Sequence, residues 1–142
     1  MTQDPIVITG GLVVLPDEPA ARHADIVLTG DTITAIEPPG SVSARGIDAS
    51  NRLIIPGLIN AHTHGHGGLA KGLGDKWSLD LLLNAGPWTG GQRRDDDRYL
   101  STLVSAVEML RKGCTACFDL AAMLPVPTET ALDSIVRAYN DL

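Results

Sequence analysis

The first third of the chain alternates short apolar runs with turns that contain glycine. Apolar runs flank Gly10-Gly11 and again Gly30-Asp31, and two-residue glycine turns between such runs are typical of β-hairpins. No apolar repeat at helical spacing occurs before residue 53. Residues 1–52 are therefore expected to form a small meander of strands, whose open edges need further strands or a partner to cover them.

The pattern changes after residue 52. Residues 53–62 are nearly all apolar, which is typical of a strand buried on both faces of a parallel sheet. Pro56 cannot donate to a strand ladder, so the strand itself is expected to begin at Leu58. The glycine-rich residues 64–74 that follow are expected to form a loop.

Two amphipathic helices are predicted farther along, with a short strand at 115–119 between them. The first has three aspartates at its N-terminus, residues 95–97, which suit the positive end of a helix, and stops at Lys112-Gly113. The second starts near Pro127-Thr128. The apolar residues at helical spacing are Leu100, Leu103, Val104, Val107 and Leu110 in the first helix, and Leu132, Ile135, Val136 and Tyr139 in the second. The order strand, helix, strand, helix predicts an α/β fold with right-handed crossovers.

Composition narrows the classes of protein. The 142 residues are 44% hydrophobic and 20% charged, which excludes a disordered chain. The net charge of −6 argues against nucleic acid and against an anionic membrane surface as partners. The start of the chain lacks the basic and apolar segments of a signal peptide, and two cysteines cannot build a disulfide framework. A soluble cytoplasmic protein with reduced thiols is expected.

The strongest chemical signal is the pair His62 and His64 at the end of the apolar strand. Residues two apart in a strand point to the same side, so both imidazoles can reach one ion at Zn–N distances of ~2.0–2.1 Å. The alternative is a pair of packed core histidines. His66 continues the alternation and is either a third ligand or a loop histidine at the mouth of a substrate pocket.

At this point the sequence resembles the amidohydrolase superfamily. Residues 56–64, Pro-Gly-Leu-Ile-Asn-Ala-His-Thr-His, resemble its first barrel strand. Residues 68–75 resemble the following loop in the branch that holds cytosine, guanine and S-adenosylhomocysteine deaminases and the triazine hydrolases. The resemblance implies that residues 1–52 form the N-terminal part of a small β-sandwich, and that residues 53–142 form the first two β/α units of a TIM-like (β/α)8 barrel.

The resemblance also implies the chemistry. Enzymes of this family are metal-dependent hydrolases of C–N bonds other than peptide bonds, and this branch deaminates small heterocyclic amines with a metal-activated water. His62 and His64 match metal ligands, and Zn²⁺ is expected, with Fe²⁺ as the other candidate. The family's later ligands and acid/base residues have no counterpart here, and a barrel takes ~250 residues. The chain is thus expected to be the front third of a larger protein, as a homo-oligomer or in association with the missing C-terminal portion. The alternative is a non-catalytic truncated or split-gene fragment that needs the remainder of the barrel.

Three further residues are candidates for contacts with substrate. Asp119 ends the second predicted strand, so it either contacts substrate, tunes a metal ligand, or caps the turn that follows. Trp77 and Trp88 lie in the long segment after the histidines. They either form the wall of a pocket for a flat ring or pack that segment onto the barrel.

Two other patterns have simpler interpretations. Cys114 and Cys117 have Cys-x-x-Cys spacing but follow a helix, whereas redox chemistry needs the first thiol at a helix N-terminus. They are expected to be buried and inert. Gln92-Arg93-Arg94 is balanced by the neighbouring aspartates, so a solvated helix start is expected rather than an anion site.

Overall fold

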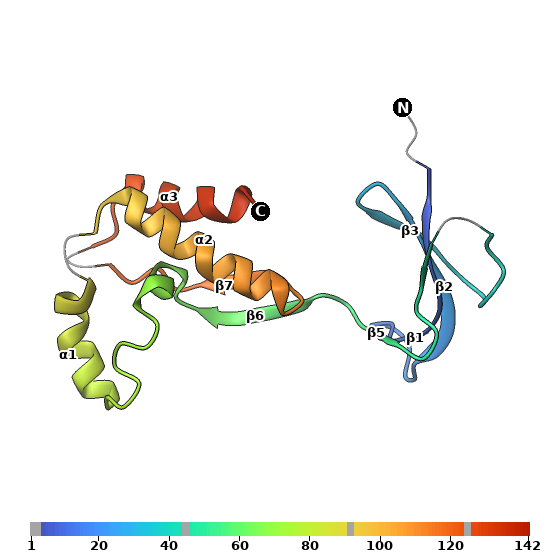
Figure 1. Ribbon diagram of the computed structural model, residues 1–142, viewed down its shortest axis with the longest axis horizontal. Helices are drawn as coiled ribbons and strands as arrows, with labels where there is room; N and C mark the ends of the chain where they lie inside the picture. The colour runs from blue at the N-terminus through green and yellow to red at the C-terminus, as the bar shows by residue number, and fades with distance from the viewer. Residues whose placement is uncertain (1–3, 44–45, 91–92, 124–125) are drawn as a thin grey trace. The chain divides into compact units, whose positions relative to one another are not determined.

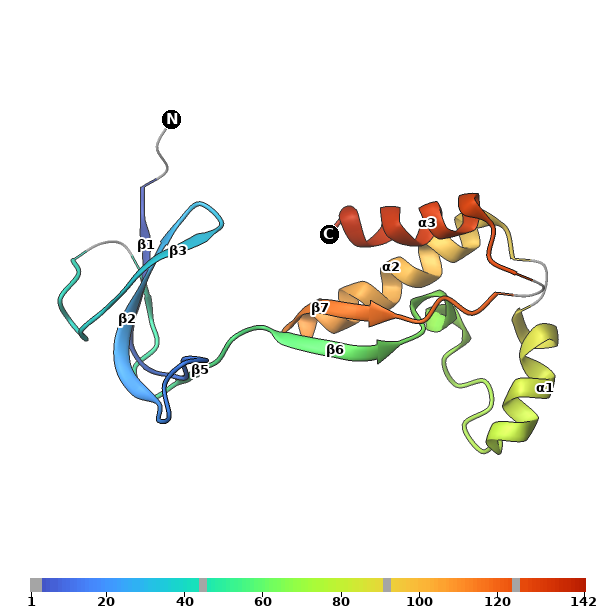
Figure 2. The same cartoon turned by 180° about the vertical axis from the view of Figure 1, so that it is seen from behind.

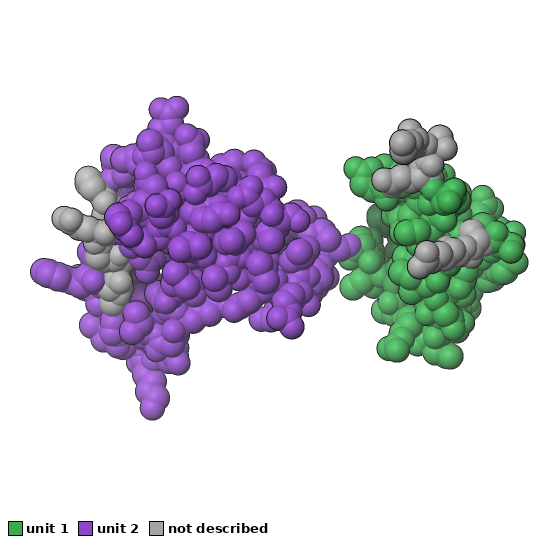
Figure 3. All heavy atoms as spheres, turned by 45° about the horizontal axis from the view of Figure 1, so that its top comes forward, with its two compact units in different colours: residues 1–56 green, residues 57–142 purple. Residues whose placement is uncertain are grey.

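The computed structural model describes residues 4–43, 46–90, 93–123 and 126–142. The chain divides into two compact units, Met1–Pro56 and Gly57–Leu142 (Figure 3). The division falls at the Pro56-Gly57 step, directly before the strand that carries the histidine pair.

The first unit is a sheet built around β1 (Ile6–Val13). Antiparallel β2 (Arg22–Thr29) lies beside β1, and β3 (Thr32–Glu37) lies beside β2. The short strands β4 (Gly46–Asp48) and β5 (Leu53–Ile54) both add to β1 in parallel; Figure 1 labels β1, β2, β3 and β5. Val13, Ala24 and Ile26 form its buried centre. The predicted hairpin at Gly30-Asp31 is confirmed, because β2 and β3 pair directly across it.

The hairpin predicted at Gly10-Gly11 is wrong. β1 runs straight through both glycines, and its register against β2 shifts between Ile8 and Gly11. A two-residue type I′ turn needs a positive φ at both positions, and of the two only Gly10 has one, at 73°. The Gly10 N–H donates instead to Oδ1 of the fully buried Asp25, at 2.9 Å. The glycines therefore make a β-bulge rather than a turn.

The second unit has the predicted α/β order. Its elements are β6 (Leu58–Thr63), the 3₁₀ helix η1 (Gly65–Ala70), α1 (Leu79–Gly90), α2 (Asp95–Arg111), β7 (Cys114–Asp119) and α3 (Glu129–Asn140). β6 and β7 pair in parallel, and α2 packs against η1, β7 and α3 (Figures 1 and 2). The predicted strand start at Leu58 and both predicted helices are confirmed.

Local signals account for the ends of those helices. Asp97 Oδ2 accepts the N–H of Arg94 at 3.0 Å at the start of α2, and Gly113 follows it with φ 84°, the backbone conformation that ends many helices. Thr128 Oγ1 accepts the N–H of Ala131 at 3.3 Å at the start of α3. Each cap satisfies backbone groups that the helix itself leaves unpaired.

The sequence interpretation missed η1 and α1. The segment expected to be a loop contains η1, and α1 has Pro87 inside it, which argues against a helix on sequence grounds. The signal that favours α1 is Ser78, whose Oγ accepts the N–H of Leu81 at 3.3 Å. A serine cap followed by leucines is a helix start. No helix among the described residues is long and apolar enough to cross a membrane.

The helix α2 buries a face different from the one expected, whereas α3 buries Ile135 of its predicted apolar face. α2 buries Ser101, Thr102 and Ala106 rather than its leucine stripe. The reason is close approach: a Cβ added at Gly68 of η1 would lie 2.3 Å from the carbonyl oxygen of Ser101, so only small side chains fit between the two helices. The apolar residues of α2 and α3 that remain exposed are Leu100, Val104, Val107, Leu110, Leu132 and Val136.

β6 is likewise not buried on both faces. Leu58 is 48% exposed and Ile59 is 73% exposed. Within the described part of the chain β6 pairs only with β7, so nothing there covers its second edge. The apolar sequence of β6 remains typical of a strand in a larger parallel sheet.

Candidate functional site

His62 and His64 lie close together at the end of β6. Their ring centroids are 5.1 Å apart and the rings meet edge to face at 81°. The register of β6 against β7 shifts between Asn60 and Thr63, and Asn60 Oδ1 accepts the N–H of His62 at 3.2 Å. Both imidazoles are exposed. The strand thus presents the two rings as neighbours, as their spacing predicts.

A backbone carbonyl orients the ring of His64. Its Nδ1 lies 2.7 Å from the carbonyl oxygen of Leu120, just beyond β7. A carbonyl oxygen only accepts, so this contact assigns the proton to Nδ1 and leaves the lone pair of a neutral ring on Nε2. Histidines that bind metals in proteins are commonly held in this way.

His66 lies in η1 and its ring centroid is 5.9 Å from that of His64. Burial lowers the pKa of His66; Asp119 opposes this effect, whereas the charges of His64 and nearby arginines add to it. Within the described part of the chain its buried Nδ1 has no hydrogen-bond partner. No set of three or more His, Cys, Asp or Glu side chains among the described residues is arranged to hold a metal ion, so the three histidines do not form a three-ligand site.

Asp119 is held by hydrogen bonds from two other elements. Its Oδ1 and Oδ2 accept the N–H of Gly65 at 3.3 and 3.2 Å, and Oδ2 also accepts the hydroxyl of Tyr139 on α3 at 2.7 Å. Burial raises the pKa of Tyr139, and its hydrogen bonds with Asp119 and Cys117 raise it further. The carboxylate therefore caps the start of η1 rather than the turn that follows β7.

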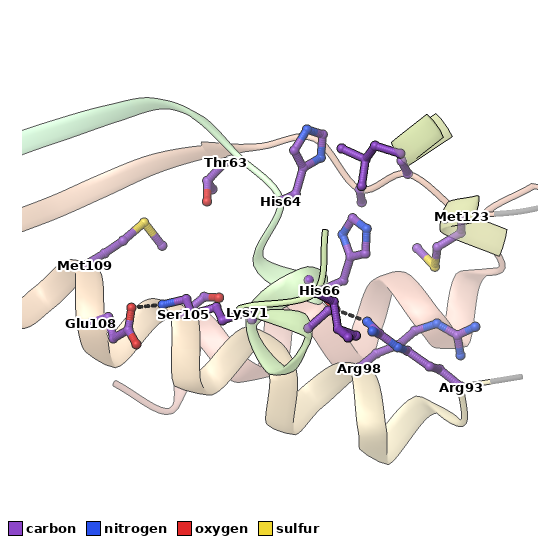
Figure 4. Close-up of a pocket in the computed structure, with 18 of the residues that line it drawn as sticks. Thr63, His64, His66, Lys71, Arg93, Arg98, Ser105, Glu108, Met109 and Met123 are labelled. Carbon is purple, nitrogen blue, oxygen red and sulfur yellow. Dashed lines mark hydrogen bonds and ion pairs between the residues drawn. The ribbon is translucent and has the colours of Figure 1, made fainter. Parts of the chain in front are cut away.

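A cavity of about 1590 Å³ lies beside the histidines (Figure 4). His64, His66 and Trp77 are among its lining residues. Trp88 on α1 is 86% exposed and is not part of the lining. The fold therefore brings one of the two predicted tryptophans to the cavity and leaves the other in solvent.

Two arginines also line this cavity, which the sequence interpretation missed. Arg93 donates a hydrogen bond to the carbonyl oxygen of His66, and Ser101 Oγ donates to the same oxygen at 2.7 Å. Arg98 pairs with Asp95 at 3.1 Å, and its side chain is only 22% exposed. The expected solvated helix start is thus wrong for Arg93, whereas the exposed side chain of Arg94 agrees with it. Gln92 lies outside the described residues. Charge balance along the chain does not reveal which side chains turn inward.

The two cysteines lie on β7, and both are free and half-buried. The expected full burial is therefore wrong, because β7 has an open face in this part of the chain. The strand context agrees with the sequence interpretation and differs from the helix N-terminus that lowers the pKa of redox thiols. Their inertness remains a prediction.

The chain is similar in sequence to deaminases of known substrate. No family model matches the chain. The chain is 38% identical over 119 residues to the 5-methylthioadenosine/S-adenosylhomocysteine deaminase of Haloarcula marismortui, covering 81% of this chain and 27% of that protein. It is 32% identical over 124 residues to the 5'-deoxyadenosine deaminase of Methanothermobacter thermautotrophicus, covering 84% of this chain and 28% of that protein.

The fold has similar solved relatives. The atrazine chlorohydrolase of Arthrobacter aurescens TC1, complexed with zinc, superposes with a TM-score of 0.79 at 26% identity, covering 96% of this chain and 33% of that one. The chain thus spans between a quarter and a third of the length of the proteins it matches. These findings confirm the resemblance: over most of its length the chain is similar, in sequence and in fold, to a segment of the deaminases and hydrolases of the amidohydrolase superfamily.

Proposed function

We propose that this chain is part of a metal-dependent hydrolase of C–N bonds other than peptide bonds, which deaminates a small heterocyclic amine. The observation that carries the proposal is the pair His62 and His64, with rings 5.1 Å apart and Nδ1 of His64 bonded to a carbonyl. Similarity to adenosine-derivative deaminases supports the reaction class.

His62 and His64 would hold the metal ion. Zn²⁺ is the favoured ion because imidazole nitrogen suits it and a similar structure was solved with zinc; Fe²⁺ fits the same donors. When bound, such an ion acts as a Lewis acid that makes water nucleophilic near neutral pH. The residues of this chain contribute two neighbouring imidazoles, and the Leu120 carbonyl holds the Nε2 lone pair of His64 available for the ion.

Two imidazoles are fewer than the three protein ligands of a catalytic zinc site. We propose that the other ligands and the acid/base groups come from protein beyond these residues, either a C-terminal portion or a second copy of the chain. The exposed apolar residues of β6, α2 and α3 support this arrangement, since such surface normally packs against neighbouring elements. In this proposal the first unit belongs to a small β-sandwich, the second begins a (β/α)8 barrel, and the cytoplasm is the site of action. We propose that the boundary expected after residue 52 lies at the Pro56-Gly57 step, because β5 (Leu53–Ile54) pairs with β1.

For the substrate, we propose a flat heterocycle in the cavity beside His64. Trp77 supports this because its ring lines the cavity, whereas the exposure of Trp88 removes that residue from the proposed wall. His66 would stand at the mouth of the cavity, where burial keeps it neutral near pH 7.

A second candidate is a non-catalytic fragment that acts only with a partner. The absence of a three-ligand group among the described residues favours it for the chain taken alone. The two candidates agree on the histidine pair and on the inactivity of residues 1–142 by themselves, and they differ in whether the protein turns over substrate once the rest of the barrel is supplied.

The test of the proposal is metal content. The assembled protein is this chain together with the protein that supplies the other metal ligands. We expect it to hold about one divalent ion per chain, and we expect the double variant His62→Ala, His64→Ala to lose that ion. His23→Ala, which changes a histidine of the other unit, is the matched control and should keep the metal. Equal metal content in the double variant and the wild type would show that His62 and His64 have a structural role and do not bind the metal.

The two candidates are separated by complementation. The chain alone is expected to show no deamination of aminopurines, aminopyrimidines or triazines. Supplying in trans the part of the Haloarcula marismortui deaminase outside the aligned segment should restore metal binding and turnover together. Turnover by the isolated chain would contradict the need for a partner, and metal binding without turnover in the complemented protein would favour the non-catalytic candidate.

A further inference from the structure

Three segments meet at the carboxyl end of β7. Asp119, its last residue, accepts hydrogen bonds from the Gly65 N–H and the Tyr139 hydroxyl, and the next residue, Leu120, accepts from Nδ1 of His64. The Leu120 N–H also donates to the carbonyl oxygen of Thr63 at 2.8 Å. Both sides of the His64 backbone are therefore tied to the same two residues of β7 and its extension.

The junction formed by His64, Gly65, Asp119, Leu120 and Tyr139 is closely packed around Gly65. A Cβ at Gly65 would lie 2.6 Å from the Tyr139 hydroxyl, 2.7 Å from Asp119 Oδ2 and 3.2 Å from a methyl of Thr102. Gly65 is itself buried. The backbone that follows His64 thus sits directly against the Asp119–Tyr139 pair, without an intervening side chain.

Tyr139 is the one member of this junction that comes from α3. Its hydroxyl is 2.7 Å from Asp119 Oδ2, and a phenol that donates to a carboxylate restrains the side-chain rotation of that carboxylate. The helix is anchored by the buried residues Ala131, Ser134, Ile135 and Ala138, so the position of the hydroxyl is determined by packing. The helix α3 is therefore linked to the turn that carries His64 by hydrogen bonds through Asp119 and Gly65.

We propose that Asp119 and Tyr139 are positioning residues, which act through Gly65 to hold the turn after β6 so that His64 bonds the Leu120 carbonyl and presents Nε2 outward. Neither residue lines the cavity beside His64, and the Asp119 oxygens already accept bonds from within the fold. Their role in metal binding rests on the proposed function, whereas their role in orienting His64 does not.

The test compares Asp119→Ala, Asp119→Asn and Tyr139→Phe in the whole chain. Asparagine keeps one carbonyl oxygen for the Gly65 N–H and can donate to Tyr139, so it should rescue part of what alanine loses. Tyr99→Phe is the matched control, because it removes a phenolic hydroxyl that bonds Asp141 at 2.8 Å on the surface of the same unit. Circular dichroism establishes which variants remain folded.

The first readout is the tautomer of His64, taken from the ¹⁵N shifts of its ring. The wild type and Tyr99→Phe should show the Nδ1–H form alone, while Tyr139→Phe and Asp119→Ala should show a mixture of both tautomers. A folded Asp119→Ala variant with the single wild-type tautomer would overturn the proposal. If that variant does not fold, Tyr139→Phe and Asp119→Asn decide the question by the same signal.

The second readout is the Zn²⁺ affinity of each variant after complementation in trans with the remaining part of the barrel, measured by competition with a chromophoric chelator. We expect Tyr139→Phe to weaken binding by about 10-fold, as for other residues that orient metal ligands, and Asp119→Asn to weaken it less than Asp119→Ala. Affinity unchanged in all three variants would contradict the metal-binding part of the inference. A complemented wild type that binds no Zn²⁺ would contradict the proposed function, and the tautomer readout would still test the positioning role.

Discussion

The backbone N–H of Gly65 donates to both carboxylate oxygens of Asp119, over 3.3 and 3.2 Å, although the two residues are 54 positions apart in the chain. This contact joins the turn after β6 to the end of β7. Residue 65 is a glycine, and any larger side chain at this position would meet the Asp119–Tyr139 pair. The conformation of the segment that carries the histidines therefore depends on the neighbouring strand β7 as much as on the sequence of the segment itself.

Gly65→Ala is expected to lower the free energy of unfolding by ~1–3 kcal/mol, the usual cost of inserting a methyl group into a packed site. Gly67→Ala is the matched control, since a Cβ there would meet no atom within 4 Å. Urea denaturation followed by circular dichroism measures both. Equal stability of the two variants would mean that the junction relaxes around the added methyl.

Asp25→Ala is expected to destabilise the first unit by about 3 kcal/mol, because hydrogen bonds to a charged group contribute ~1.5–3 kcal/mol each. The fully buried carboxylate accepts the N–H of Gly10 at 2.9 Å and that of Gly40 at 2.8 Å. Asp17→Ala, which removes an exposed carboxylate of the same unit, should change little. Hydrogen exchange at the Gly10 and Gly40 amides gives a local measurement, and unaltered protection there would contradict the assignment.

Tyr139 should make stability depend on pH in the alkaline range. Its pKa is raised above 10.0 in the folded chain by burial and by its hydrogen bonds, so between the unfolded and the folded pKa the native state binds more protons. Its contribution to stability is complete below pH 10 and is lost as the pH rises above that value. Urea denaturation from pH 8 to 11 should show a steeper decline for the wild type than for Tyr139→Phe; parallel declines would rule out this coupling.

The double variant Cys114→Ala, Cys117→Ala is expected to keep the metal content of the assembled protein, at a packing cost of ~1–2 kcal/mol. Both thiols are half-buried on β7, and Cys117 contacts the Tyr139 hydroxyl, so a loss of stability without a loss of metal is the expected pattern. Metal analysis and thermal unfolding check the two parts separately. Loss of metal from a folded double variant would show that the thiols take part in the site.

Part of the fold was predictable because its signals are local. The start of β6 follows from Pro56, which cannot join a ladder; α2 follows from the aspartates in its first turn and from Gly113 near its end; and α3 follows from its cap, Thr128. The proximity of His62 and His64 follows from strand alternation alone. Each of these depends on residues within a few positions of one another.

Other features depended on contacts that the local sequence does not encode. Gly10-Gly11 has the sequence of a turn, yet the buried carboxylate of Asp25 accepts the Gly10 N–H and converts the site into a bulge. The helix α2 has a leucine stripe, yet it buries its small residues because the backbone of η1 approaches at Gly68. In both cases a partner distant in sequence decided between two locally acceptable structures.

The order of strands and helices, the histidine pair at the end of an apolar strand and the resemblance to a hydrolase can all be read from the sequence. The folded structure was needed to show that Leu120 orients the ring of His64, that Asp119 and Tyr139 hold Gly65, and that Trp77 reaches the cavity while Trp88 does not. The difference comes from the distance along the chain over which each interaction acts. Periodicity, capping and turn preference act over a few residues, whereas ring orientation and cavity lining depend on hydrogen bonds and close packing between segments up to 56 residues apart.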